Sequence, residues 1–275
     1  MSMRKTLFVF LLFCSCSTSP YPYRLAICAI FKNEAPWLKE WVDYHRNVLK
    51  VDHFYLYNNE SADGFRNVLQ DYINQGIVEV IDWDSTTVSH LSEGSFMDAP
   101  WSAAQLGAYN DCLKQRALGK AKWVAMIDID EFIVPVKGVA SFYALLDRAE
   151  THKKGTVSMY WRVFGTSGVK ELKEGERLIE KLTLRAADDH PSHRLVKSIH
   201  RPEAVDFCLV HIADKLKPGY GAKTFKADAV RIHHYWTRTE QAFIEKRNGG
   251  KALDVAQLEP LHQVQDTTIH QYLYD

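Results

Sequence analysis

The chain has 275 residues, a length that suits one α/β domain with a sizeable hydrophobic core. Lysine plus arginine and aspartate plus glutamate each number 34, so the formal net charge is zero. This balance gives no indication of a polyanion-binding surface, and we expect no nucleic-acid partner. The sequence has no repeat, low-complexity segment or long linker, so a single domain is predicted.

Residues 1–19 have the layout of a secretory signal. Arg4 and Lys5 precede an apolar run over residues 7–13, and small residues follow. The run is short for a helix that crosses a bilayer. We therefore expect a signal peptide or a short membrane-tethering leader, and a protein that is exported, secreted or membrane-associated. A cytoplasmic protein is expected only if the leader is not functional.

Strands and helices are predicted to alternate from residue 24 to residue 81. The apolar run over 24–31 is typical of a buried strand, and further strands are predicted over 53–57 and 78–81. Helical spacing follows Pro36 and returns over 65–72, which gives the alternation of a doubly wound sheet. His45 lies within the apolar stripe of the first helix, so we interpret it as a core histidine.

A further helix is predicted over residues 102–118, with Gly119 as its stop. Its polar residues are expected to lie mostly on a solvated face; they are Gln105, Asn110, Asp111 and Arg116. Arg116 could instead approach a phosphate group of a ligand. The cysteines of the domain are Cys28, Cys112 and Cys208, which are widely separated and have no C-x-x-C spacing. They are predicted to be buried apolar residues, not a disulfide frame or a zinc site.

The stretch KWVAMIDIDEFIVP, residues 122–135, carries the most informative pattern. A short apolar run typical of a buried strand stops abruptly at Asp128, Asp130 and Glu131. Ligands of α/β sheets bind at the carboxyl ends of the strands, and the two aspartates would point the same way if the strand pleat continued. Paired carboxylates repel each other, so a cation is their natural partner, and oxygen ligands favour Mg²⁺ or Mn²⁺ over zinc. The alternative is a strand that ends in solvent.

The second half of the chain contains further predicted elements. A short helix is expected after Ser141, and strands over 157–164, 195–199 and 230–236. Lys197 and Arg201 could offset the negative charge of a bound diphosphate group, or they could simply lie on the surface. Thr237 to Glu240 has the pattern of a capping box, which predicts a helix that ends at 248–250. The last residues are polar and receive no role.

These segments resemble a known family. WVAMIDIDEFIVP, with its D-x-D of Asp128 and Asp130, is similar to the metal site of GT-A glycosyltransferases, and in particular to family 92 and its relatives in the family 2 group. CAIFKNEAPWLKEWVDYH, FYLYNNESADG, AAQLGAYNDCLKQR and VRIHHYW are similar to segments of the same family. The resemblance implies an α/β fold of GT-A type, a doubly wound mixed sheet with helices on both faces. The domain would cover 23–250, with a nucleotide-binding half (23–135), an acceptor half (136–250) and a C-terminal tail (251–275).

The resemblance also implies a reaction and its residues. A sugar would pass from a nucleotide-sugar, UDP-sugar above all, to a glycan or other hydroxyl acceptor, with Mn²⁺ or Mg²⁺ and with inversion. The metal ligands implied are Asp128, Asp130 and His234, and the residues near the nucleotide are Asn33, Glu34, Asn59, Asp63 and Asp128. The same polar residues could simply form turns. Trp161 would lie on the acceptor side or in the core. No motif identifies the catalytic base; the acidic residues in the relevant region are Asp188, Asp189, Glu203 and Asp206.

Two other classes of function remain open. A non-catalytic secreted carbohydrate-binding protein could keep this fold without turnover. A metal-dependent phosphohydrolase could also use paired aspartates, but its D-x-D-x-T pattern is absent here because Phe132 follows Glu131. A hydrolase would release free phosphate or sugar without an acceptor, which distinguishes it from a transferase.

Overall fold

The computed structural model describes residues 19–84, 100–246 and 258–273. Nearly all of the predicted leader and the end of the helix predicted to stop at 248–250 lie outside the described residues. In the part that is described, no helix is both long enough and apolar enough to span a membrane. Export or membrane tethering through residues 1–19 stays a prediction.

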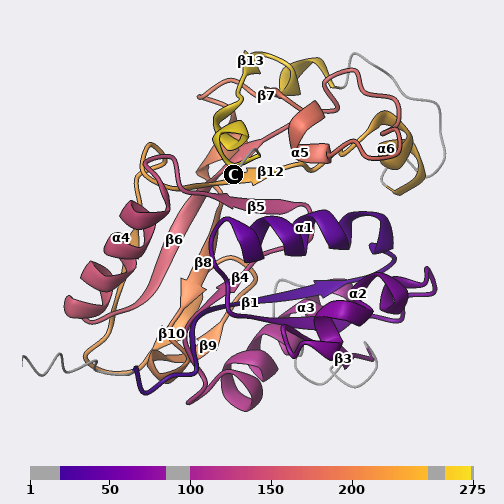
Figure 1. Cartoon of the computed structure of the whole chain (residues 1–275). Coiled ribbons are helices and arrows are strands. Elements are labelled where there is room, and N and C mark those ends of the chain that lie inside the picture. The colour runs from indigo at the N-terminus through magenta and orange to yellow at the C-terminus, as the bar shows by residue number, and fades with distance from the viewer. Residues whose placement is uncertain (1–18, 85–99, 247–257, 274–275) are drawn as a thin grey trace, which may run out of the picture.

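A mixed sheet of nine strands forms the centre of the described fold (Figure 1). The order is β3-β2-β1-β4-β8-β6-β12-β5, and β11 pairs with the first half of β6. The predicted α/β fold, with a mixed sheet in a single domain, is confirmed. The strands of this sheet are β1 (Tyr23–Phe31), β2 (His53–Asn58), β3 (Val78–Asp82), β4 (Ala121–Met126), β5 (Glu131–Val134), β6 (Lys154–Val163), β8 (Val196–His200), β11 (Gly221–Thr224) and β12 (Arg231–His234).

The first four strands make the parallel half of the sheet. β1 pairs in parallel with β2 on one side and with β4 on the other. Residues 25–31 are all buried, as expected for a parallel strand that is covered on both faces. Their side chains alternate between two core clusters, because successive residues of a strand point to opposite faces: Leu25, Ile27, Ala29 and Phe31 on one face, and Ala26, Cys28 and Ile30 on the other.

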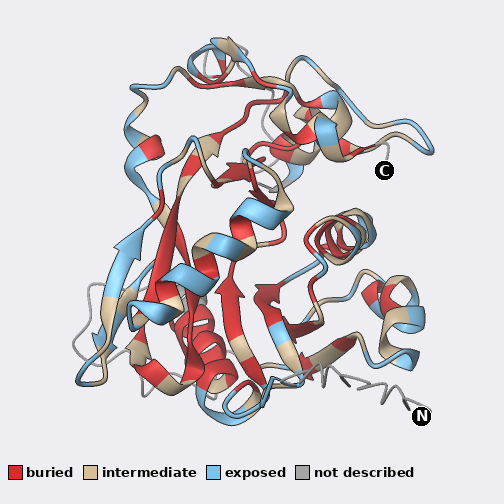
Figure 2. Cartoon of the chain, turned by 60° about the vertical axis from the view of Figure 1, so that its left-hand side comes forward, coloured by how far each residue is buried: buried red, intermediate tan, exposed pale blue. Residues whose placement is uncertain are grey.

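Helices cover both faces, as predicted. One core cluster joins the sheet to α1 (Ala35–Asn47), α2 (Phe65–Asn74) and α4 (Val139–Thr151). The other joins it to α3 (Pro100–Asp111), to the π-helical turn η2 (Cys112–Arg116) and to the hairpin of β9 (Val205–Cys208) and β10 (Ala213–Leu216). Figure 2 shows the central strands buried and the outer surfaces of the helices exposed. The core placement of His45 and the burial of free Cys28, Cys112 and Cys208 are confirmed.

The solvated face expected on α3 is wrong for Gln105 and Asn110, which are both buried. Asn110 donates from Nδ2 to the carbonyl of Cys208 (2.9 Å) and accepts from its backbone N–H (3.0 Å). The helix lies between the sheet and β9, so both of its sides are covered. Helical spacing alone could not reveal the second covering layer.

The antiparallel half begins beyond β4. β8 pairs antiparallel with both β4 and β6, while β12 lies between β6 in parallel and β5 in antiparallel orientation. Short elements connect and extend this half: α5 (Leu178–Lys181), β7 (Leu184–Arg185), η3 (Pro191–Arg194) and η4 (Pro202–Ala204). Two helix starts differ from prediction. α4 begins at Val139, ahead of Ser141, and α6 (Glu240–Lys246) is capped by Thr239, whose hydroxyl accepts from the N–H of Ala242 (3.3 Å).

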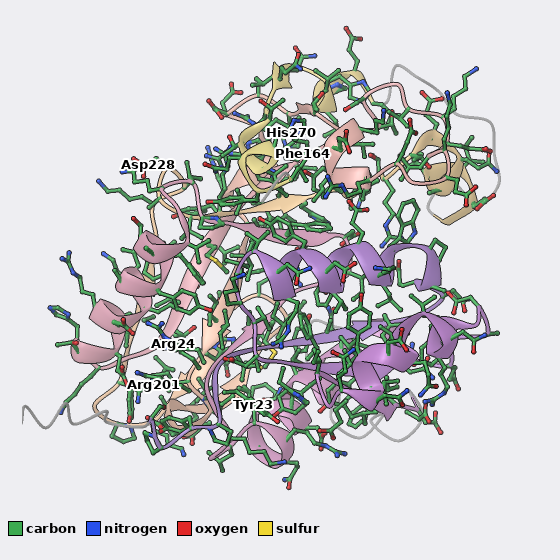
Figure 3. The ribbon with its side chains drawn as sticks, in the orientation of Figure 1. Tyr23, Arg24, Phe164, Arg201, Asp228 and His270 are labelled. Carbon is green, nitrogen blue, oxygen red and sulfur yellow. The ribbon has the colours of Figure 1, made fainter. Side chains whose placement is uncertain are left out.

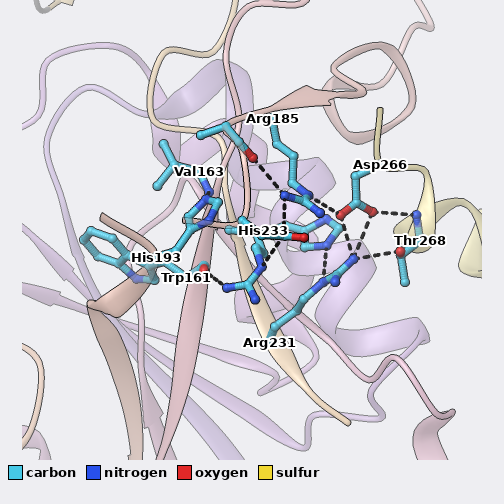
Figure 4. A network of polar contacts seen from close by, with 11 residues as sticks. Trp161, Val163, Arg185, His193, Arg231, His233, Asp266 and Thr268 are labelled. Atoms are coloured by element: carbon cyan, nitrogen blue, oxygen red, sulfur yellow. Dashed lines mark hydrogen bonds and ion pairs between the residues drawn. The ribbon is translucent and has the colours of Figure 1, made fainter. Parts of the chain in front are cut away.

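The segment expected to form a polar tail packs on the domain where it is described. Its elements are η6 (Glu259–Leu261), β13 (Val264–Gln265) and η7 (Thr268–Tyr272), and β13 pairs with β7. Leu258, Ile269 and Leu273 are buried, and Asp266 accepts from Arg185 and Arg231 (Figure 4). The buried residues are widely spaced among polar ones, so no regular hydrophobic period announced them.

Candidate functional site

A cleft of about 890 Å³ opens at the carboxyl ends of β1 and β4. The chain leaves β1 toward β2 and β3 and then returns past β1 to β4, so the strand order reverses between these two strands. Such a switch point leaves a crevice that connections do not cover, and it is where ligands bind in α/β sheets. The polar and aromatic residues that line the cleft are Phe31, Lys32, Asn33, Glu34, Trp37, Gln105, Asp128, Asp130, Trp161, His211, His234, Trp236, Arg238 and Glu245.

Asp128 lines the cleft but is held from the protein side. Its Oδ1 accepts from Gln105 (2.8 Å) and Tyr109 (3.1 Å), and its Oδ2 accepts from the ammonium of Lys197 (2.9 Å). Burial would lower the pKa of the wholly buried Lys197, but the carboxylates of Asp128 and Glu131 outweigh burial and raise it. The Asp128 side chain is still 33% exposed, so it can contact a ligand in the cleft while these bonds persist.

Glu131 lies beneath the cleft and is fully buried. Its Oε2 accepts from the backbone N–H of Asp128 (2.8 Å) and is 3.7 Å from the Lys197 ammonium. Burial raises the pKa of Glu131 well above its usual range, in spite of the nearby Lys197. The third acidic residue of the motif is therefore a support for the turn that carries the first two, not a wall of the cleft.

Asp130 is paired with His234 on the cleft wall. β12 and β5 pair so that His234 is opposite Glu131, which brings the imidazole Nε2 to 3.5 Å from Oδ1 of Asp130. The Trp161 ring lies against His234, with 4.4 Å between centroids. A carboxylate oxygen and an imidazole nitrogen at this separation suit a divalent cation such as Mn²⁺. Among the described residues, however, no group of three or more acidic, histidine or cysteine side chains could hold a metal.

The expectation that Asp128 and Asp130 point the same way does not hold in its simple form. β4 ends at Met126, so the strand pleat does not reach the aspartates, which follow in a turn. Both line the cleft, yet Asp128 is bonded to α3 and β8 while Asp130 faces β12. His233, the residue before His234 in β12, points to the other face of the strand and accepts from the Arg231 side chain (3.1 Å) in the network of Figure 4.

The residues expected near the nucleotide divide into two groups. Asn33 and Glu34 line the cleft, whereas Asn59 and Asp63 do not. Asp63 instead accepts from the N–H of Ala35 at the start of α1 (2.7 Å), and Asn33 accepts from the N–H of Ala62 (2.9 Å). The loops after β1 and β2 thus brace each other. Asn59 and Asp63 therefore support the cleft wall through hydrogen bonds to the end of β1 and the start of α1, without lining the cleft themselves.

The sequence reasoning missed Arg238, a buried cation on the cleft wall. Its guanidinium is 2.6 Å from the carboxylate of Glu34 and lies over the Trp37 ring, 5.2 Å from the centroid. Burial lowers the pKa of Arg238, while Asp130 and Asp128 act in the opposite direction. Its backbone is in the left-handed region (φ 55°), so the surrounding structure enforces this placement. Its position just beyond β12, at the end that carries His234, was the available signal.

The sequence as a whole matches a known family. The family model of glycosyltransferase family 92 matches residues 22–269. The chain belongs to glycosyltransferase family 92. It is 26% identical over 229 residues to a family 92 protein of Ricinus communis, which covers 82% of this chain and 37% of the relative. It is also 26% identical over 242 residues to a family 92 protein of Oryza sativa subsp. japonica, covering 85% of this chain and 37% of the relative. The chain thus spans well under half the length of these relatives.

Two solved structures resemble the chain at low sequence identity. S. aureus TarS (residues 1–349) superposes with a TM-score of 0.43 at 11% identity, covering 91% of this chain and 69% of that one. The mannosyltransferase PcManGT from Pyrobaculum calidifontis, in complex with GDP-Man and Mn²⁺, gives a TM-score of 0.35 at 16% identity, covering 53% of this chain and 39% of that one.

The four acidic residues considered as a base in this family 92 chain lie outside the cleft. Asp188 is largely exposed and pairs with Arg185 (2.9 Å), and Asp189 lines a separate hollow beside it. Glu203 pairs with Arg201, and Asp206 belongs to β9. The groups of the second half that do line the cleft and can take a proton include His211 and Glu245.

Two basic residues expected to offset phosphate charge have other partners. Lys197 is committed to Asp128 and Glu131, and Arg201 pairs with Glu203 and Glu150. Arg116 pairs with Glu79 (2.9 Å) and Asp111 and also lies outside the cleft. Arg238 is the buried arginine of the described cleft wall.

Proposed function

We propose that this chain is a metal-dependent glycosyltransferase that moves a sugar from a nucleotide-sugar, with UDP-sugar as the leading candidate, to a hydroxyl group of a glycan or another acceptor. The observation that carries the proposal is the convergence of Asp130, His234 and Arg238 in one cleft at the switch point of the sheet. Membership of family 92 supports the same reaction class.

The donor diphosphate would lie between two positive centres. Arg238 would bind phosphate oxygens from one side, because a guanidinium offers several donors in a fixed plane. Asp130 and His234 would hold Mn²⁺ or Mg²⁺ on the other side, with Asp128 beside them, and this cation would supply Lewis-acid stabilisation of the departing nucleoside diphosphate. Asn33 and Glu34 at the end of β1 would contact the nucleoside through hydrogen bonds.

The acceptor side would be built from the second half of the chain. Trp161 is mostly buried but lines the cleft next to His234 and His211, so its edge can pack on a sugar ring. Inversion requires one group to take the proton of the acceptor hydroxyl as it attacks. His211 and Glu245 line the cleft, whereas Asp188, Asp189, Glu203 and Asp206 do not, so we propose the base among the former.

Calorimetric titration of UDP and of UDP-sugars tests the proposal, with Mn²⁺ or with EDTA, on the wild type, on Asp130→Ala and on the surface control Asp228→Ala. We expect metal-dependent binding in the wild type and the control and its loss in Asp130→Ala. A folded wild type that binds no nucleotide would favour the carbohydrate-binding alternative. Release of free sugar or phosphate at the same rate with and without acceptors would favour a hydrolase.

A further inference from the structure

A second hollow of about 560 Å³ lies on the flank of α4, away from the cleft. It is enclosed by α4 on one side and by residues 223–229 on the other, and it shares no lining residue with the cleft. We call this hollow the α4 groove. Its apolar lining residues are Leu145, Ala149, Phe225 and Ala229. Phe225 and Ala149 are buried, so they form a floor.

The other residues of the α4 groove are strongly biased toward positive charge. Its basic residues are Lys137, Arg148, His152, Lys154, Lys223 and Lys226, and its acidic residue is Asp228. Asp228, which Figure 3 labels, is 3.8 Å from Lys137, the residue two positions before α4. Within the described residues, Arg148, Lys154, Lys223 and Lys226 take part in no ion pair. The chain as a whole is neutral, so this bias is local.

Charge and shape together select the ligand. Unpaired like charges around one hollow repel each other, and an anion placed among them removes that cost. Inorganic phosphate has no apolar surface to place against Phe225 and Leu145, whereas a phospholipid has an anionic headgroup next to apolar chains. Basic residues at a membrane surface gain attraction to anionic lipid, and apolar side chains gain from contact with the acyl boundary.

We propose that the α4 groove docks the protein on a membrane surface that contains anionic phospholipid. The headgroup phosphate lies among Arg148, Lys223 and Lys226, and the glycerol and upper acyl portion lie against Phe225 and Leu145. This surface is separate from the N-terminal leader, and it does not depend on the proposed reaction. It gives the domain its own means of facing a bilayer.

Sedimentation of the full chain with vesicles tests the proposal. The vesicles contain phosphatidylcholine alone or phosphatidylcholine mixed with phosphatidylglycerol, at low and high salt. The test variant is Arg148→Glu/Lys223→Glu/Lys226→Glu, and the control reverses two charges elsewhere, Lys170→Glu/Lys173→Glu, at exposed lysines near α5. All carry the same leader, so a difference between them reports on the groove. Circular dichroism melting confirms that each is folded.

The wild type and the control should bind the anionic vesicles, with weaker binding at high salt. Each basic residue near the surface contributes about 1 kcal/mol, so the test variant should bind at least about a hundredfold more weakly. Equal binding to neutral and anionic vesicles, or equal loss in control and test variants, would overturn the proposal. So would full release of the wild type by soluble glycerophosphate, because a free anion would then be the occupant.

Discussion

The ammonium of Lys197 lies 2.9 Å from Oδ2 of Asp128, and the lysine is wholly buried. This contact distinguishes the two aspartates of the D-x-D motif, because Asp128 is anchored to β8 while Asp130 is paired with His234 on the cleft wall. Lys197 is also 3.7 Å from Glu131, so one cation offsets two carboxylates that closely follow β4. We infer that Lys197 makes the concentration of acidic residues at this strand end compatible with folding.

Replacement of Lys197 by methionine is expected to lower the free energy of unfolding by about 3–5 kcal/mol, because it leaves a buried carboxylate without its counter-charge. Urea denaturation followed by tryptophan fluorescence measures the loss. As a control, Lys32→Met removes an exposed ion pair with Glu60 and should cost at most about 1 kcal/mol. The double change Lys197→Met/Asp128→Asn should recover part of the loss. Equal effects of the Lys197 and Lys32 variants would refute the role of Lys197.

Asp128 and Asp130 should respond differently to the same isosteric change. Asp128→Asn removes the charge that faces Lys197 and should cost about 3 kcal/mol of stability or more. Asp130→Asn should cost less stability and should abolish the increase in UDP affinity that the proposed function expects from Mn²⁺. Urea unfolding and calorimetry on both variants measure the two effects. If both variants keep wild-type stability and lose metal-dependent binding alike, the two aspartates are equivalent ligands and the division drawn from Lys197 is incorrect.

The parallel half of the sheet could be predicted from sequence because its signals are local. β1 and β2 are largely apolar runs, and β3 is a short one interrupted by Glu79. Asp128 and Asp130 follow a further apolar run, so the change from apolar to acidic residues marks the end of that strand. The role of Lys197 could not be predicted, since it depends on β8 being inserted between β4 and β6, a pairing of distant segments. Arg238 was missed for the same reason: its partner Glu34 is in the other half of the chain.

Arg238 is expected to contribute directly to donor binding. Arg238→Gln keeps hydrogen-bond donors but removes the charge, and hydrogen bonds to charged groups contribute about 1.5–3 kcal/mol. UDP affinity should therefore fall by about ten- to a hundredfold. Calorimetry at fixed Mn²⁺ measures the change. Arg116→Gln is the matched control, because this arginine pairs with Glu79 outside the cleft, and it should leave affinity unchanged. Wild-type affinity in Arg238→Gln would remove Arg238 from the donor site.

His45 should make the fold sensitive to acid. Its Nδ1–H donates to the carbonyl of Trp41 (2.8 Å) and its Nε2 accepts from the N–H of Ile133 (3.3 Å), so the neutral ring fits and the protonated ring does not. Burial lowers the pKa of His45 from its ordinary value of 6.5 to about 3. The unfolded chain therefore binds this proton first, and the stabilisation is complete above about pH 6.5 and is lost as the pH falls toward 3.

The sensitivity can be measured as a slope. Between the pKa of the unfolded chain and the lower pKa of the folded protein, each such histidine lowers the free energy of unfolding by about 1.4 kcal/mol for every unit by which the pH falls. Urea unfolding at several pH values between 6 and 4 should give a slope that is smaller by about this amount in His45→Leu than in the wild type. Parallel curves for the two proteins would show that His45 does not titrate differently in the folded state.

Asp266 should be essential for attachment of the C-terminal segment. Its carboxylate accepts from Arg185 (2.7 Å) and Arg231 (2.7 Å) and from the N–H of Thr268 (3.1 Å) (Figure 4). Burial alone would raise the pKa of Asp266, but the neighbouring His233 and Arg231 and the hydrogen bonds from Thr268 outweigh burial and lower it. The group is thus a buried anion that holds two arginines from different strands, β7 and β12.

Asp266→Asn would leave Arg185 and Arg231 facing each other without a shared anion. We expect a loss of about 3 kcal/mol in the free energy of unfolding, together with faster proteolysis of the last residues of the chain. Asp228→Asn is the matched control, because it removes an exposed partner of Lys137 and should cost at most about 1 kcal/mol. Urea denaturation and limited proteolysis followed by mass spectrometry measure both effects. Equal stability of the two variants would mean that the apolar contacts of Leu258, Ile269 and Leu273 hold the segment without help from the ion pairs.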